Sequence, residues 1–330
     1  MKWIAFGLVL LLIFGCAGPA APPANQTGGG TTQGNQTSGG HLVIGEGQGS
    51  VVTQGGGETP VPATEYASNL NADLYVYFFN VGSGDIQGDA ILIKKGDMDI
   101  LVDAGPTQKQ QDLVNYLMEA GVDDFELVVS TNDDPEHTGG LQYVSGRFDF
   151  GELWRPEEGS DSYTAYLNSL HAESYKFVGE GDTKTLNGVT LTVLNPIRGE
   201  DRFFDVNNDG VVLKVEDRGL CILLTGDILG SQQTVATKSG PCQIVQWPNH
   251  GVSEGLTDMS WFMDQTRPEV IVISGSATDW TNSRQSLMGA AHLGGVRNIT
   301  VLENYLGKDV KITWDGEEYN ATIEGMPRRH

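Results

Sequence analysis

Three short segments of the chain carry carboxylate and imidazole side chains directly after stretches predicted to be β-strands. They are 131–140 with Glu136 and His137, 225–227, which ends in an aspartate, and 248–251, which contains a histidine. Rigid strands that present such groups from separate loops are what a metal site needs. Each segment taken alone is equally well explained as a polar turn or a helix cap. The three together predict a metal site at the strand ends.

The elements that position these segments are short strands with helices between them. Apolar or β-rich runs broken by Gly and Asp predict strands, and apolar residues at helical spacing predict helices. The predicted strands are 74–80, 90–94, 99–103, 125–130, 189–195, 211–216, 220–225, 243–246, 270–274, 299–302, 309–314 and 319–323. The predicted helices are 109–120, 161–171, 256–264 and 283–293. Two mixed sheets packed face to face, with the helices outside, would bury all of them.

The charge balance excludes one class of partner. Lys and Arg total 20 against 43 Asp and Glu, a formal net charge of −23. Such a chain repels a polyanion, so we expect no basic surface for nucleic-acid binding. The three cysteines are too few for an all-cysteine zinc site. Cys221 and Cys242 begin predicted strands that lead to the site loops, and a disulfide and two free thiols are equally open for them.

The N-terminus is typical of an exported protein. An apolar run over residues 3–15 follows Lys2, is too short to span a bilayer comfortably, and stops at Cys16. Residues 13–16 resemble a lipobox, in which the chain is cut before the cysteine and its thiol is lipidated. We therefore predict a lipoprotein signal over 1–16, with an uncleaved signal anchor as the alternative. Both place the protein outside the cytoplasm and anchored to the membrane.

Composition divides the rest of the chain into two parts. Residues 17–72 are rich in Gly, Thr and Gln and carry no Lys or Arg. Such a stretch cannot bury enough apolar surface to offset the entropy of ordering it, so we predict a flexible tether. Residues 73–330 contain all the predicted strands and helices and are expected to form one globular domain.

Two motifs early in this domain resemble a known family. FNVGSGD at 79–85 and ILVDAG at 100–105 look like the opening of the metallo-β-lactamase fold, in the form found in the extracellular hydrolase domain of ComEC-like competence proteins. The later segments follow in the family's order. The resemblance implies an αββα sandwich of two mixed sheets with outer helices. The first loop admits two registers, because Gly84-Asp85 and Gly88-Asp89 both fit the family's Gly-Asp-Ala pattern.

The resemblance also implies two metal positions, and this chain has lost ligands from the first. Asn132 stands where the family has a histidine, Asp134 stands at the second ligand position, and the turn 207–209 supplies the third. Asn249 likewise replaces the first of two late histidines. An amide is a poor zinc ligand beside imidazole or carboxylate. We therefore expect Asn132, Asn249 and Asp103 to line the site without holding a metal.

The second metal position keeps its ligand types. Glu136, in place of the family's aspartate, lies next to His137, and His250 and a bridging Asp227 complete the set. We predict at most one zinc or other divalent metal at these four residues, with Asp134 as a weaker ligand.

The implied activity is hydrolysis of a phosphodiester-type substrate, either a small molecule or a polymer. Metal-activated water would attack phosphorus, and Glu136 or Asp134 would orient or deprotonate that water. The alternative is a catalytically inactive binding lipoprotein that keeps the scaffold.

One motif suggests calcium instead. Asp205, Asn207 and Asp209, followed by Gly210 and by Glu216 at the twelfth position, match a calcium-loop pattern. A strand and not a helix is predicted to follow, which favours a simple turn. A calcium-stabilised module remains an alternative.

Export gives the first testable prediction. The mature chain should begin at a lipidated Cys16, because the apolar run and the cysteine have lipoprotein spacing. Mass spectrometry of the N-terminal peptide of the membrane-extracted protein measures this. An unmodified chain that still carries residues 1–15 would contradict it.

Overall fold

The computed structural model describes residues 68–82, 86–199, 205–229, 232–252, 259–275, 280–304 and 308–324. The chain divides into two compact units, Met1–Glu58 and Thr59–His330, and all described residues belong to the second. The predicted signal, Cys16 and most of the predicted tether lie outside the described residues. Within the described ranges, no helix is long and apolar enough to cross a membrane.

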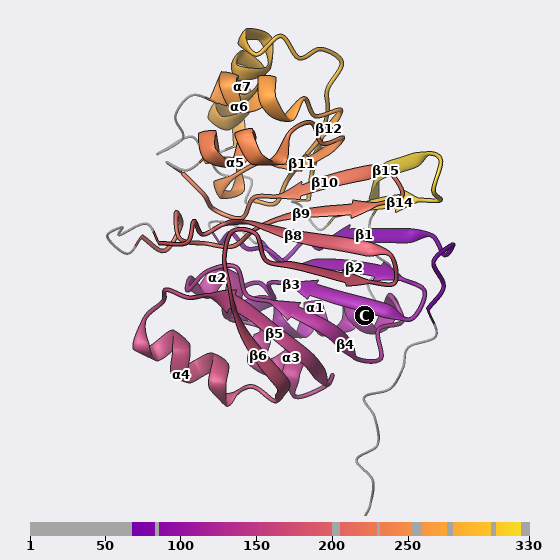
Figure 1. Ribbon diagram of the computed structural model, residues 1–330, viewed down its shortest axis with the longest axis vertical. Coiled ribbons are helices and arrows are strands. Elements are labelled where there is room, and N and C mark those ends of the chain that lie inside the picture. Colours follow the sequence, from indigo (N-terminus) through magenta and orange to yellow (C-terminus); the bar gives the residue numbers. More distant parts are fainter. Residues whose placement is uncertain are drawn as a thin grey trace, which may run out of the picture. The chain divides into compact units, whose positions relative to one another are not determined.

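The described strands form two sheets (Figure 1). The first has the order β15-β14-β1-β2-β3-β4-β5-β6, and the second has the order β13-β12-β11-β10-β9-β8-β7. The strands are β1 (Leu74–Phe78), β2 (Ile91–Lys95), β3 (Met98–Val102), β4 (Phe125–Val129), β5 (Phe150–Pro156), β6 (Ala172–Val178), β7 (Thr183–Leu186), β8 (Val189–Asn195), β9 (Val212–Asp217), β10 (Leu220–Leu224), β11 (Ile244–Gln246), β12 (Val270–Ile273), β13 (Thr300–Glu303), β14 (Asp309–Trp314) and β15 (Tyr319–Glu324).

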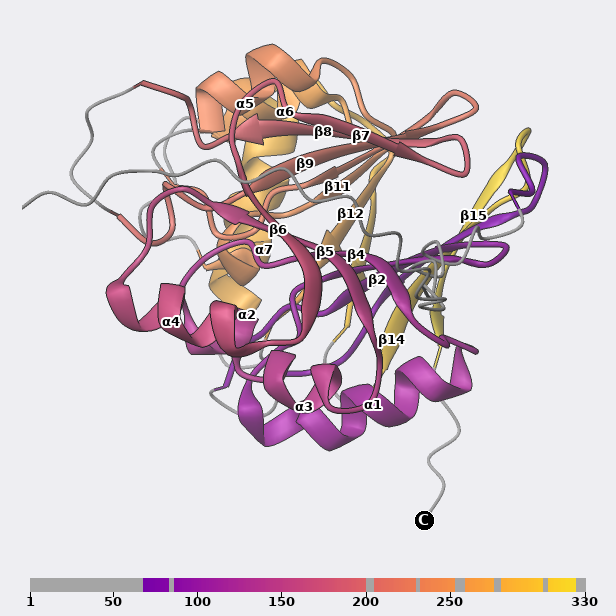
Figure 2. The same cartoon turned by 60° about the horizontal axis from the view of Figure 1, so that its bottom comes forward.

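Helices lie on the outer faces of the two sheets (Figures 1 and 2), and short ones lie in the loops that follow β4 and β11. They are η1 (Thr107–Lys109), α1 (Gln110–Glu119), α2 (Pro135–Thr138), α3 (Leu141–Ser145), α4 (Asp161–Ser169), α5 (Gln232–Ser239), η2 (Asn249–Gly251), α6 (Met259–Thr266) and α7 (Trp280–Leu293). Helices α1, α3 and α4 cover the first sheet, and α5, α6 and α7 cover the second. The αββα sandwich expected from the sequence is therefore confirmed.

Both sheets are mixed in the same way. In the first sheet β15, β14, β1, β2 and β3 are antiparallel neighbours, whereas β3, β4, β5 and β6 are parallel. In the second sheet β7 to β10 are antiparallel, whereas β10, β11, β12 and β13 are parallel. The carboxyl ends of parallel strands lie at one edge of a sheet, so each sheet offers one edge on which loops gather.

Period-2 alternation decides which side chains fill the core between the sheets. In β1, for example, Leu74, Val76 and Phe78 are buried while Tyr75 and Tyr77 are only half-buried. These three residues belong to one apolar cluster to which both sheets contribute. The inner faces of the sheets are thus held together by hydrophobic burial, which keeps the strand ends in fixed relative positions.

The structure contains strands that the sequence patterns do not predict, namely β5, β6 and β7. Strand β6 is a partly exposed edge strand whose charged residues interrupt an apolar pattern. The predicted helix 161–171 is also too long, because α4 ends at Ser169 and β6 begins at Ala172.

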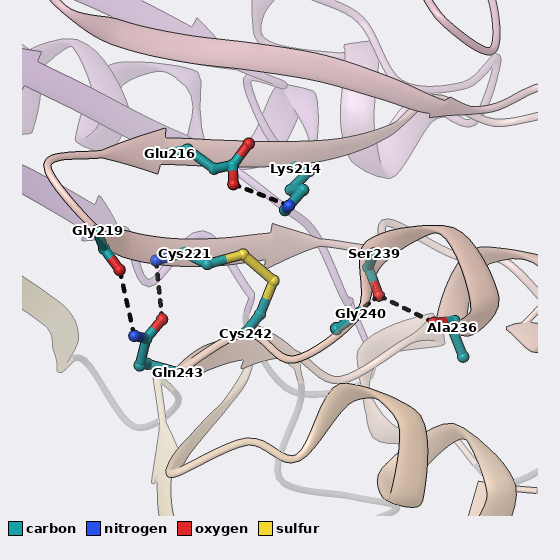
Figure 3. The surroundings of a disulfide bond; sticks show 9 residues. All are labelled: Lys214, Glu216, Gly219, Cys221, Ala236, Ser239, Gly240, Cys242 and Gln243. Carbon is teal, nitrogen blue, oxygen red and sulfur yellow. Dashed lines mark hydrogen bonds and ion pairs between the residues drawn. A yellow bond between two sulfur atoms is a disulfide. The ribbon is translucent and has the colours of Figure 1, made fainter.

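Cys221 and Cys242 form a disulfide in the structure, which answers the question that the sequence leaves open (Figure 3). Their Cα atoms are 4.7 Å apart. The bridge joins the start of β10 to the residue two positions before β11, and Gln243 accepts a hydrogen bond from the Cys221 amide at 2.9 Å. The two strands whose ends carry Asp227 and His250 are therefore covalently linked at their other ends.

Candidate metal centre

The segments that the sequence singles out meet at one edge of the sandwich. The loops after β3, β4, β10 and β11 carry Asp103, His137, Asp227 and His250. The side chains of these residues contact one another in sequence, Asp103 to His137, His137 to Asp227, and Asp227 to His250. None of the four residues is more than 5 % exposed. Both sheets thus contribute to one buried polar cluster.

His137, on α2, is held between two carboxylates. Its Nδ1 lies 2.8 Å from Asp103 Oδ2, and Thr131 donates to the same carboxylate from N at 2.8 Å and from Oγ1 at 2.6 Å. Because a carboxylate only accepts, the Nδ1–H group donates its hydrogen bond to Asp103. The other ring nitrogen, Nε2, lies 2.7 Å from Asp227 Oδ2. Such a carboxylate–imidazole pair fixes the ring for metal binding.

His250 is oriented by an unusual turn. Asn249 and His250 have φ angles of 50° and 51°, a left-handed conformation that costs free energy for residues other than glycine and is enriched at functional sites. The Nδ1 atom of His250 donates to the carbonyl of Ser274 at 2.7 Å. At Gly275 a Cβ would lie only 2.7 Å from the His250 carbonyl oxygen, so this close packing requires glycine.

The free nitrogen of His250 then points at acidic oxygens. His250 Nε2 lies 3.3 Å from Asp227 Oδ1 and 3.7 Å from Glu136 Oε1. Asp227 thus receives one imidazole Nε2 at each of its two oxygens.

Burial and charge act in opposite directions on these groups. Burial alone lowers the pKa of His137, but the Asp227 and Asp103 carboxylates outweigh it and raise the pKa well above the usual value. Burial also opposes the charged form of His250, yet Asp227 and Asp89 raise its pKa to about 9. Burial raises the pKa of Asp227, but the two imidazoles hold it well below its usual range. The cluster therefore favours positive charge beside the Asp227 carboxylate.

Three buried atoms of this cluster lack hydrogen bonds. Within the part of the chain that the structure describes, Asp89 Oδ1, Asp227 Oδ1 and His250 Nε2 have no hydrogen-bond partner. Each such atom costs about 1–3 kcal/mol when nothing satisfies it.

A cation among these atoms would relieve that cost. Donor atoms that share a tetrahedral zinc ion lie about 3.3–3.5 Å apart, given zinc–ligand distances near 2.0–2.1 Å. The separations of 3.3 and 3.7 Å around His250 Nε2 are close to this value. The group of Asp89, His137, Asp227 and His250 has the donor types for a divalent metal. His137 Nε2 and Asp227 Oδ2, 2.7 Å apart, are in direct hydrogen-bond contact. Glu136 groups instead with Asp134 and Asp227, so its role as a ligand stays a prediction.

Asp89 belongs to the cluster, although the sequence reasoning did not choose it as a site residue. It is 1 % exposed, and its donor atoms lie within 4.8 Å of those of His137, Asp227 and His250. Burial raises the pKa of Asp89, and the two imidazoles oppose this. The sequence signal that could have identified Asp89 is Gly88-Asp89, one of the two pairs that fit the family's Gly-Asp-Ala pattern. The other pair, Gly84-Asp85, lies outside the described residues.

Gln246 is a second residue that the sequence reasoning missed. Its Nε2 donates to Asp89 Oδ2 at 2.8 Å and to Ser274 Oγ at 3.1 Å. Its Oε1 accepts from the backbone amides of Thr225 and Gly226 at 3.1 and 3.3 Å. One buried amide thereby joins the segment before β2 to the ends of β10, β11 and β12.

Asn132 and Asp134, which the resemblance assigns to the family's first metal position, lie beside Asp227. Asn132 is buried, and its Nδ2 donates to Asp227 Oδ2 at 3.5 Å while its Oδ1 accepts from the Asp134 amide at 3.0 Å. Asp134, Glu136 and Asp227 bring carboxylate oxygens within 4.8 Å of one another. Burial, followed by nearby acidic groups, raises the pKa of Asp134 although His137 lowers it.

The predicted calcium residues form a turn that stabilises itself. Asp205 Oδ1 accepts from the amides of Asn207 and Asn208, each at 3.1 Å, and Asp209 Oδ2 accepts from the Asp205 amide at 2.8 Å. Glu216 pairs with Lys214 at 2.8 Å. Neither candidate metal cluster found among the described residues includes this turn. Calcium binding stays a prediction.

Asn249 is placed beside the cluster by its backbone. Its amide donates to the Gly226 carbonyl at 3.1 Å, which ties η2 to the loop that carries Asp227. None of the side-chain hydrogen bonds among the described residues joins Asn249 to the metal ligands.

A comparison with protein families decides the relationship. The family model described as "Metallo-beta-lactamase superfamily" matches residues 83–289, more than half of the chain. The chain belongs to the metallo-beta-lactamase superfamily. The resemblance that the sequence motifs indicate is thereby confirmed, and the sandwich with its strand-edge cluster agrees with it.

Among individual proteins, the chain is similar to the competence protein ComA of Neisseria gonorrhoeae, with 25 % identity over 219 residues. The match covers 64 % of this chain and only 29 % of ComA. The chain thus spans less than a third of this relative's length.

Two solved structures are similar to the chain at low sequence identity. The metallo-beta-lactamase fold protein YhfI from Bacillus subtilis has a TM-score of 0.49 and 11 % identity, with 70 % of this chain and 96 % of that chain covered. Zinc-bound PqqB from Methylobacterium extorquens has a TM-score of 0.48 and 13 % identity, with coverages of 70 % and 98 %.

The donor set gives a prediction of metal content. The purified chain should bind at most one transition metal, and His137→Ala should abolish this binding because no other imidazole besides His250 faces Asp227 in the described residues. Metal analysis after exhaustive dialysis measures the stoichiometry. His171→Ala, at an exposed residue, is the matched control and should leave it unchanged.

The double variant Asn132→His, Asn249→His should raise the stoichiometry toward two, because it restores imidazoles to the first position. Two tightly held metals in the wild-type chain would contradict the single-site interpretation.

Proposed function

We propose that this protein is a metal-dependent hydrolase of the ComEC-like type that acts on phosphodiester-type substrates with a reduced, single-metal centre. The observation that carries this proposal is the buried cluster in which two imidazole Nε2 atoms face one carboxylate while three of the cluster's buried polar atoms have no hydrogen bond. Membership of the superfamily and the similarity to ComA support it.

A divalent metal bound here would act as a Lewis acid and lower the pKa of a water molecule toward neutrality. The chain's own groups would prepare that water and the substrate. Glu136 has a side chain 35 % exposed, and its Oε1 already lies near His250 Nε2. It can accept the proton of the attacking water. Asp134, whose pKa burial raises, is the second candidate base.

The charge of the chain limits the substrate. With a net charge of −23, a long nucleic acid would be repelled along most of its length. A small phosphodiester, which needs only the metal centre and its immediate surroundings, suits this surface better. We therefore place polymeric nucleic acid second.

We also propose that the enzyme works outside the cytoplasm, anchored to the membrane through a lipid on Cys16. The apolar run before Cys16 and the Gly-rich composition of 17–72 support this location. The tether would hold the domain away from the lipid surface, where a diffusing substrate reaches it.

The alternative function is that of an inactive binding lipoprotein. The replacement of family histidines by Asn132 and Asn249 favours it. The two functions differ in one respect that is simple to measure, which is turnover after metal loading.

Turnover gives the next prediction. The metal-loaded chain should hydrolyse bis(p-nitrophenyl) phosphate, and Asp227→Asn should lower kcat/KM at least about 100-fold, because that carboxylate binds the metal and both imidazoles face it. Release of p-nitrophenol measures the rate. Asp264→Asn, which changes a half-exposed aspartate on α6, is the control and should keep the wild-type rate.

A chain that holds its metal and yet hydrolyses no phosphodiester probe would contradict the proposal and favour the binding lipoprotein.

A further inference from the structure

Arg155 lies next to the loop 131–140 that carries His137, called the metal loop below, although nothing described so far gives it a role. It lies near the carboxyl end of β5, the parallel neighbour of β4, and the Ser130 amide donates to the Trp154 carbonyl at 2.9 Å. The metal loop starts at the next residue, Thr131. Burial lowers the pKa of Arg155, and both Tyr163 and Asp133, which belongs to that loop, oppose this. The strand order thus fixes a cation beside the loop that carries His137.

Arg155 differs from the other cations of the domain. Most Lys and Arg side chains that the structure describes form an ion pair with a carboxylate, as in Lys95 with Asp217 and Arg198 with Asp182. Those with no ion pair to a described residue are Arg147, Arg155, Arg297 and Lys308. The other three are exposed, whereas Arg155 is 5 % exposed. A buried cation without a counter-ion is unfavourable unless something compensates it.

The guanidinium of Arg155 contacts two aromatic rings and makes one long hydrogen bond within the described residues. Its Cζ lies 4.2 Å from the ring centroid of Phe177 and 5.7 Å from that of Tyr163. Among its N–H groups, Nη1 alone has a hydrogen-bond acceptor in the described residues, the Pro156 carbonyl at a long 3.4 Å. A stacked guanidinium still directs its N–H groups outward in its own plane, in a fork that matches an oxyanion.

The aromatic contacts also fix the position of this fork. Tyr163 is 2 % exposed and donates from its hydroxyl to Ser130 Oγ at 2.8 Å, so the ring beneath Arg155 is tied to the end of β4. The Ser160 amide, at the start of α4, donates to Asp133 Oδ2 at 3.0 Å. Arg155 is therefore preorganised relative to the metal loop, and a bound anion would not have to order it.

We propose that Arg155 binds an oxyanion of the substrate, a phosphate group in the reaction proposed above, and so supplies the local positive charge that an acidic protein needs to admit an anionic substrate. This inference rests on the proposed function for the identity of the substrate. The binding of an oxyanion by Arg155 stands on the unpaired, stacked guanidinium itself.

The experiment compares Arg155→Gln and Arg155→Lys with the wild-type chain and with Arg198→Gln as the matched control, since Arg198 is exposed and already paired with Asp182. With bis(p-nitrophenyl) phosphate, Arg155→Gln should raise KM at least about tenfold while kcat changes by less than about threefold, because a charged hydrogen bond to the substrate is lost. Arg155→Lys keeps the charge but not the forked N–H groups, so its KM should lie between the KM values of the wild type and Arg155→Gln. Arg198→Gln should match the wild type.

A second measurement does not depend on turnover. Calorimetric titration with inorganic phosphate should show binding to the wild-type chain and at least about tenfold weaker binding to Arg155→Gln, with thermal unfolding of the variants recorded alongside. If Arg155→Gln fails to fold, the phosphate affinity of Arg155→Lys tests the proposal instead. It should be several-fold weaker than that of the wild type.

The outcomes separate the two proposals. A wild type that binds phosphate through Arg155 but hydrolyses no diester would overturn the proposed function and leave the anion site intact. Equal phosphate affinity in wild type and Arg155 variants, or a KM unchanged in both variants, would assign Arg155 a packing role and overturn this inference.

Discussion

The buried carboxylate of Asp227 is the constraint on which the site depends. An isolated carboxylate 3 % exposed would carry a large desolvation cost, so it needs positive charge on both of its oxygens. His137 and His250 supply it from opposite sheets, at 2.7 and 3.3 Å. In the absence of a metal, protons on the imidazoles would carry this charge. A divalent cation would do so while also satisfying the three buried atoms that have no hydrogen bond.

The apolar core and the polar hydrogen-bond network both hold this arrangement, each in a different way. The cluster between the sheets sets where the strands end, and the hydrogen bonds at the edge set where the side chains point. Asp103 turns His137, the Ser274 carbonyl turns His250, and Gln246 joins the strand ends to Asp89. At these buried positions, such hydrogen bonds are electrostatically stronger than at a surface. This explains how the geometry can persist although the family's first metal position has lost its imidazoles.

The sequence predicted the sandwich and brought out His137, Asp227 and His250, because strand-end loops with carboxylates and imidazoles are visible in a linear pattern. It could not show that Asp89 reaches the site, since that depends on the cross-sheet hydrogen bond from Gln246 to Asp89. Arg155 was missed for a different reason. Strand β5 contains Gly151 and ends at Pro156, which breaks the alternating pattern, and the burial of a lone arginine depends on Tyr163 and Phe177 from other elements.

The most direct test of this account is anomalous diffraction from crystals of the protein grown with zinc. The account predicts one strong peak at the sheet edge, about 2.0–2.2 Å from His137 Nε2, His250 Nε2 and the Asp227 carboxylate, with Glu136 nearby. An empty edge in the presence of excess zinc, with His137 still hydrogen-bonded directly to Asp227, would contradict it.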